Sequence, residues 1–114
     1  MNNDVLRRLR FILDFGDDQM IDTFLLGGTE VSRKQVSSWL KKDDAPDFLK
    51  LEDRELAAFL NGLIIKKRGA KDGITPRTES RLNNNIVLRK LMIAFSLRSD
   101  DVVTVLALAD FNMS

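Results

Sequence analysis

The sequence contains no histidine, no cysteine and no tyrosine. The absence of histidine excludes imidazole general-base catalysis, and the absence of cysteine excludes thiol nucleophiles and disulfides. Zinc sites built on nitrogen or sulfur ligands are excluded as well. The 18 basic and 17 acidic side chains nearly cancel, so the overall charge does not favour strong capture of nucleic acid. These absences predict a protein without catalytic activity, cofactor or metal.

Long apolar runs and export signals are also missing. The longest mostly apolar run extends from Val102 to Ala109, whereas a membrane-spanning helix needs about 20 apolar residues. The N-terminus has neither the basic nor the apolar part of a signal peptide. We therefore predict a cytoplasmic protein that does not associate with membranes.

What is present is helical periodicity. Apolar residues make up 44% of the 114 residues, and they recur at intervals of three and four positions. The two prolines, Pro46 and Pro76, lie between the periodic stretches. No stretch alternates apolar and polar residues as a half-buried strand would. The pattern predicts an all-α fold built as a small helical bundle.

Helix boundaries follow from capping residues and glycines. Expected helix starts are Asn2 or Asn3, Asp17, Ser32, Asp53, the Asn83–Asn85 run and Ser99. Ser32 and Gln35 have the spacing of a capping box. Gly16 is expected to end the first helix and Gly27–Gly28 the second. Gly62 lies inside the fourth helix, where glycine is unfavourable, so we expect a neighbouring helix to approach closely there.

The chain matches itself when it is shifted by 82 residues, so that residues 2–32 lie over 84–114. The identical pairs include Asn2/Asn84, Asn3/Asn85, Val5/Val87, Leu6/Leu88, Arg7/Arg89, Leu9/Leu91, Asp18/Asp100 and Ser32/Ser114. Chance would produce about two identities. We therefore predict a duplicated helical unit.

The repeat predicts the domain organisation. Residues 2–69 would form a first unit of four helices, residues 70–83 a linker with a short helical turn, and residues 84–114 two helices of a second unit. The second unit has no counterpart of Trp39 or Phe59, which suggests a chain that stops partway through its second repeat.

Several segments resemble a known family. They are Trp39 to Asp44, Phe59 to Ile64, Lys67 to Gly69, Arg81 to Leu91 and Ile93 to Leu97, and the last two are the most specific. They resemble the bacterial YehS-type family of unknown function, and the resemblance covers the whole chain. It implies an all-helical protein with two copies of the unit. It implies no established activity, so no functional residue is assigned from it.

The segment from Asp17 to Lys42 has the order of a helix-turn-helix. Ser32 would cap the second helix, and Arg33, Lys34, Gln35 and Ser38 would face a DNA groove. Against this interpretation, the turn is long, and residues 1–61 carry 9 basic and 12 acidic side chains. An ordinary amphipathic helix with a solvated polar face is the preferred interpretation.

A second basic group surrounds Arg68 and includes Lys67 and Arg81. It could bind phosphate, RNA or an acidic partner. The simpler interpretation is solvation of a helix end, where cations complement the helix dipole. No aromatic residue is interleaved with the group, which argues against stacking of single-stranded bases.

Two further polar features have ordinary explanations. The aspartate pairs 17/18, 43/44 and 100/101 could ligate a divalent cation, but they lack calcium-loop spacing and two of them begin helices. The Asn83–Asn85 run could recognise the backbone of a partner. Its preferred interpretation is helix capping, because Asn2–Asn3 precede the matching helix.

We therefore predict a non-catalytic helical interaction or regulatory module that binds a protein partner or forms a homo-oligomer. Nucleic-acid binding through the helix-turn-helix-like element or the Arg68 group is the alternative. For self-association, the expected contacts are the uncovered apolar residues of the last helix, namely Val102, Val103, Leu106 and Phe111.

Overall fold

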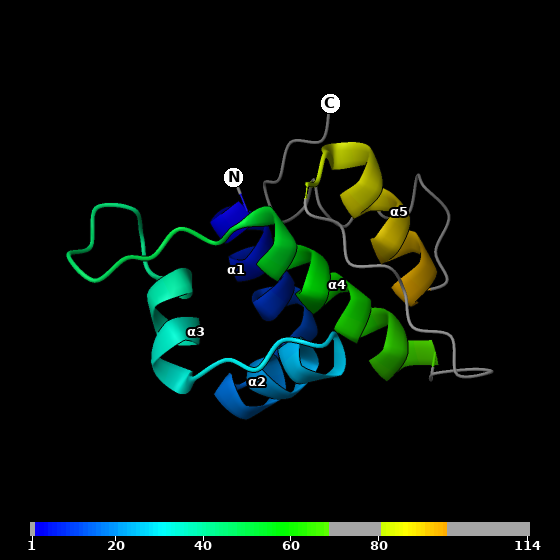
Figure 1. The fold of residues 1–114 in the computed structure, drawn as a ribbon, viewed down its shortest axis with the longest axis horizontal. Helices are drawn as coiled ribbons and strands as arrows, with labels where there is room; N and C mark the ends of the chain where they lie inside the picture. Colours follow the sequence, from blue (N-terminus) through cyan, green and yellow to red (C-terminus); the bar gives the residue numbers. More distant parts are fainter. Residues whose placement is uncertain (1, 69–80, 96–114) are drawn as a thin grey trace.

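The computed structural model of the protein describes residues 2–68 and 81–95, which form five helices and no strand (Figure 1). They are α1 (Asn2–Leu13), α2 (Asp17–Leu26), α3 (Arg33–Leu40), α4 (Asp53–Arg68) and α5 (Asn84–Phe95). The predicted all-α fold class is confirmed. The helix expected after Ser99 lies outside the described residues.

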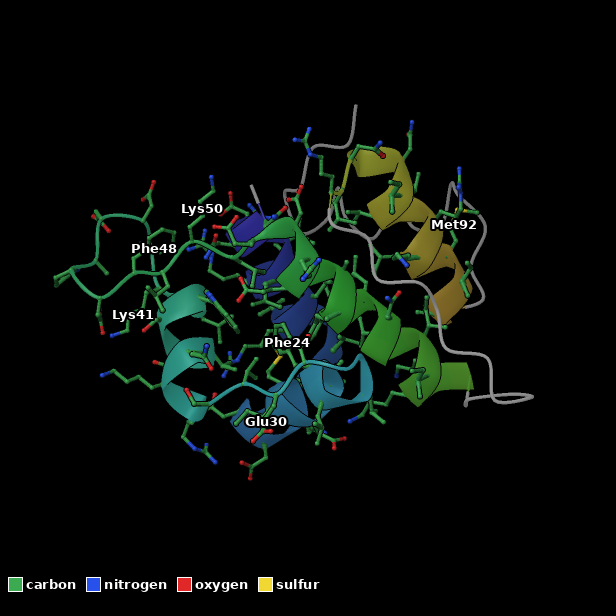
Figure 2. All side chains as sticks on the ribbon, viewed as in Figure 1. Phe24, Glu30, Lys41, Phe48, Lys50 and Met92 are labelled. Atoms are coloured by element: carbon green, nitrogen blue, oxygen red, sulfur yellow. The ribbon has the colours of Figure 1, made fainter. Side chains whose placement is uncertain are left out.

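Helix α4 is the central element of the bundle, and α1, α2 and α5 all pack against it. Phe24 of α2 lies in the middle of the bundle (Figure 2). Its ring contacts one aromatic ring from α3 and one from α4. Its ring centroid lies 5.2 Å from that of Trp39 and 5.0 Å from that of Phe59. All three side chains are buried. Tilted aromatic pairs at this separation add to the stabilisation from apolar burial.

Two glycines let α2 and α4 approach at backbone distance. A Cβ atom at Gly62 would lie 1.8 Å from the carbonyl oxygen of Thr23, and one at Gly27 would lie 1.7 Å from that of Ala58. Real Cβ atoms do not come this close to backbone oxygens, so both positions require glycine. The close approach predicted for Gly62 is confirmed.

The connection between α1 and α2 differs from the prediction. Asp14, and not Gly16, has the left-handed backbone that ends α1 (φ 55°). Aspartate tolerates this conformation better than most residues because its short side chain can form local hydrogen bonds. Gly16 is instead the residue before α2, and its backbone N–H donates to Oε1 of Gln19 at 2.9 Å.

The start of α3 follows the prediction. The side chain of Ser32 accepts a hydrogen bond from the backbone N–H of Gln35 at 3.1 Å. In return, Oε1 of Gln35 accepts from the backbone N–H of Ser32 at 2.8 Å. The capping box is therefore confirmed.

Helices α1 and α5 both run alongside α4 in the same direction as α4 (Figure 1). Asp53, the first residue of α4, is hydrogen-bonded both to Asn2 in α1 and to Leu82 before α5. Two turns further along α4, Asn61 accepts from the buried Lys90 of α5 at 2.5 Å. The bounds of α1 and α5 also coincide under the shift of 82 residues.

Candidate functional site

The first turn of α1 holds the chain segment that leaves α3. The side chain of Asn3 is fully buried, and its amide nitrogen donates to the backbone oxygens of Trp39 at 2.9 Å and Leu49 at 2.8 Å. Its Oδ1 accepts from the backbone N–H of Leu51 at 3.0 Å. The prediction that Asn3 caps its own helix is therefore wrong. Its side chain instead satisfies buried backbone groups of a distant segment.

Arg7 lies one helical turn after Asn3 and extends this contact. It donates to the carbonyl oxygen of Lys41 at 2.8 Å and forms an ion pair with Asp4. That carbonyl belongs to the residue that ends α3, where helical carbonyls lack intrahelical partners. We call Asn3 and Arg7 the α1 clamp, because together they hold both ends of the segment 41–51.

A cavity of about 540 Å³ lies beside the α1 clamp. Figure 2 shows Lys41 and Phe48 on the adjacent segment between α3 and α4. The cavity is lined by Asp4, Arg7, Leu40, Lys42, Asp43, Asp44 and Phe48. Three carboxylates, two cations and two apolar side chains therefore meet there. This mixed lining suits a polypeptide or another polar ligand better than a strongly charged one.

Asp53 links α1, α4 and the entry to α5. Its carboxylate accepts hydrogen bonds from the side-chain amide of Asn2 at 2.6 Å and from the backbone N–H of Leu82 at 3.0 Å. The hydrogen bond from Asn2, followed by that from Leu82, lowers the pKa of Asp53 below its ordinary value. Both bonds favour the ionised carboxylate, so Asp53 stabilises the fold more when it is charged than when it is protonated.

We expect the Asp53→Asn variant to be less stable than the parent protein at pH 7, and we expect this difference to shrink as the pH falls below about 4. A carboxylate whose pKa is lowered by folding contributes stability above its unfolded pKa of about 3.9, and this is lost as the pH falls through the folded pKa. Urea unfolding across this pH range measures the difference. A difference that stays constant down to pH 2 would contradict the assigned role.

Of the four residues predicted to face a DNA groove, Ser38 is buried, which contradicts the prediction for that residue. Two others are already engaged within the chain. Arg33 forms ion pairs with Asp17 and Asp18 of α2, and the hydrogen bond to Asp18 is the main cause that raises its pKa. The side-chain oxygen of Gln35 belongs to the capping box of α3. Lys34 is exposed on the same helix.

Two members of the Arg68 group lie apart in the part of the chain that the structure describes. Lys67 is exposed in the last turn of α4, whereas Arg81 is exposed near Asp53 at the start of that helix. Fourteen residues of helix separate Asp53 from Lys67, which corresponds to roughly 21 Å. The side chain of Arg68 is outside the described part of the chain.

Several predicted contacts fall where the structure gives no description. The proposed self-association residues Val102, Val103, Leu106 and Phe111 lie outside the described residues, as does the pair Asp100/Asp101. Among residues 2–68 and 81–95, no group of three acidic side chains is placed to hold a metal ion. None of the helices in these ranges is long and apolar enough to cross a membrane.

The asparagine run before α5 is explained only in part by capping. Oδ1 of Asn83 accepts from the backbone N–H of Ile86 at 2.9 Å, which confirms capping at this position. Asn85 is exposed on α5, although its counterpart Asn3 is fully buried. The α1 clamp was not predicted from the sequence. The sequence does contain a signal for it, because the pair Asn3 and Arg7 recurs with the same spacing as Asn85 and Arg89.

Comparison with known proteins identifies relatives without a known activity. The chain is 43% identical over 116 aligned residues to the uncharacterized protein YehS of Escherichia coli (strain K12). The alignment covers 100% of this chain and 74% of that protein. No solved structure matches the chain significantly. Residues 2–69 match the family described as "Protein of unknown function (DUF1456)". The chain therefore belongs to this YehS-type family of unknown function, as its sequence predicted.

Proposed function

We propose that the protein is a non-catalytic module that binds other polypeptides, either a different protein or a second copy of itself. The observation that carries this proposal is the exposure of Phe11 in the last turn of α1. Its side chain is 82% exposed, although the neighbouring core is closely packed. Ile12 beside it is also exposed. Burying one large apolar side chain contributes about 1.5–3 kcal/mol, so this turn offers a binding contact.

Charge placement supports a polypeptide rather than nucleic acid as the partner. Arg33 is neutralised by two aspartates, and Lys67 and Arg81 lie toward opposite ends of α4. Affinity for nucleic acid depends on several cations that contact neighbouring phosphates. The mixed-charge cavity beside the α1 clamp is likewise not an anion site.

Site-specific photo-crosslinking in growing cells tests the proposal. A photoreactive phenylalanine analogue at position 11 is expected to form one distinct cross-linked species, with either a partner or a second 13.0 kDa chain. The same analogue at the exposed Arg54 of α4 serves as the control. The Phe11→Ser variant should bind the identified partner at least tenfold more weakly. A tenfold change corresponds to a loss of roughly 1.4 kcal/mol of binding free energy.

A cross-linking pattern at position 11 identical to that at position 54 would contradict the proposal. So would an identified partner whose affinity is unchanged by Phe11→Ser. Far-ultraviolet circular dichroism of the variant verifies that its helices are intact.

A further inference from the structure

The end of α1 carries one charged side chain on each side of its exposed apolar pair. Phe11 and Ile12 form this pair, Arg10 precedes it and Asp14 follows it. Both charged side chains are exposed, and neither forms an ion pair with any residue that the structure describes. We call these four residues the α1 end patch. The patch therefore presents an apolar centre between a cation and an anion.

Asp14 is an unfavourable residue for the stability of this turn. Its backbone has the left-handed conformation (φ 55°), which glycine adopts without steric cost. Its carboxylate also follows the last residue of α1, where the helix dipole disfavours negative charge. Residues that break local rules in this way are typical of functional sites. A contact outside the chain therefore explains the charge of Asp14 better than the stability of the turn does.

Hydrogen bonds within the chain hold the α1 end patch in place. The backbone N–H of Asp14 donates to the carbonyl oxygen of Phe11 at 3.2 Å, and that of Phe15 donates to the carbonyl oxygen of Arg10 at 3.1 Å. Phe15 itself is buried, so it anchors the end of the turn in the core. The patch is therefore ordered before it binds, which lowers the entropic cost of association.

We propose that the α1 end patch binds the same patch of a second copy of this chain across a two-fold axis. Such an axis brings the patch against itself, so every contact between two different residues occurs twice. With the axis through the apolar pair, the two Phe11 rings cover each other, and Arg10 of each copy lies beside Asp14 of the other. One surface therefore supplies both the apolar cover and the opposite charges. This inference rests on the proposed function and selects a second copy as the partner.

The size of the α1 end patch predicts a weak dimer. Stable interfaces use roughly 20 to 30 residues on each side, many more than the patch contains. Exposed ion pairs add little affinity each, although the symmetry provides two of them. We therefore expect a Kd of about 0.1–1 mM.

Exchange of the two charges tests the symmetry of the contact. Sedimentation equilibrium of the full chain up to about 1 mM should show a monomer–dimer equilibrium. Arg10→Asp and Asp14→Arg each place like charges together twice in a dimer, so each variant alone should dimerise about tenfold more weakly. A mixture of the two variants should recover dimers, because each contact between unlike variants again joins a cation and an anion. Arg54→Asp, at an exposed site of α4, should dimerise like the parent.

The Asp14→Gly variant separates binding from stability. Glycine retains the left-handed backbone and removes the charge, so urea unfolding should show a protein at least as stable as the parent. Its dimerisation should nevertheless weaken about threefold or more, because both ion pairs are lost. A merely structural role of Asp14 would leave dimerisation unchanged.

A parent chain that remains monomeric at about 1 mM would overturn the inference. Charge variants that dimerise as well as the parent would overturn it too, as would a mixture that recovers no dimer. Circular dichroism of both charge variants verifies that their helices are intact. A distinct cross-link from position 11 to a different protein, together with a monomeric parent chain, would retain the proposed function and reject only the second copy.

Discussion

Replacement of Gly62 by alanine is expected to destabilise the protein by about 3 kcal/mol or more. The added methyl group would lie 1.8 Å from the carbonyl oxygen of Thr23 and 2.8 Å from its carbonyl carbon. These are backbone atoms of α2, so the clash can be relieved only if α2 and α4 separate. Alanine favours a helix interior over glycine by about 1 kcal/mol, which is too small to offset this loss of packing.

Urea unfolding followed by fluorescence of Trp39 measures the effect, because this is the only tryptophan and it is buried. Gly27→Ala should behave like Gly62→Ala, because its Cβ would lie 1.7 Å from the oxygen of Ala58. Gly16→Ala is the matched control, since nothing lies within 4 Å of the added atom. We expect it to cost about 1 kcal/mol or less, as at other helix N-caps. A similarly small cost for Gly62→Ala would show that α2 and α4 do not meet as described.

The second large effect is expected for Asn3→Ala, at roughly 2–4 kcal/mol of stability. The substitution leaves the carbonyl of Trp39 and the N–H of Leu51 without their buried partner, and it also removes the bond to Leu49. Each buried backbone group left unsatisfied costs about 1–3 kcal/mol, although water entering beside the exposed Leu49 recovers part of this.

The helix α5 provides the matched control for this prediction. Asn85→Ala removes the same side chain from the equivalent position of a helix of the same length, but there the asparagine is exposed. We expect Asn85→Ala to change the free energy of unfolding of the protein by no more than about 0.5 kcal/mol. If Asn3→Ala and Asn85→Ala lowered the free energy of unfolding equally, the buried hydrogen bonds of the α1 clamp would not explain the effect of Asn3→Ala.

Local rules predicted the helices because the information they need lies within a few residues. Ser32 and Gln35 satisfy each other's backbone across a single turn, so the start of α3 can be predicted without its neighbours. The apolar periodicity of the fourth helix predicted its start at about Asp53, where α4 begins. The end of α1 was predicted wrongly because both Asp14 and Gly16 can end a helix, and the pattern does not decide between them.

The candidate site was harder to predict because its partners are distant in the sequence. Asn3 lies 36 to 48 positions from the backbone groups it binds. An asparagine at a helix start is usually a cap, and only the folded chain shows that this one is buried. The ion pairs of Arg33 were hard to predict for the same reason, since the carboxylates that bind it belong to the preceding helix.

By itself, the sequence determined that the chain is helical, where most helices begin and which family it belongs to, because periodicity, capping and identity are encoded locally. Its lack of histidine and cysteine also removed whole classes of chemistry. Only the tertiary structure decided which of the two asparagine–arginine pairs binds a distant segment. Asn3 and Arg7 are engaged because α3 and the segment after it fold back onto α1, whereas Asn85 and Arg89 are exposed on α5. Whether a side chain is a buried structural contact or an exposed binding group depends on what packs against it.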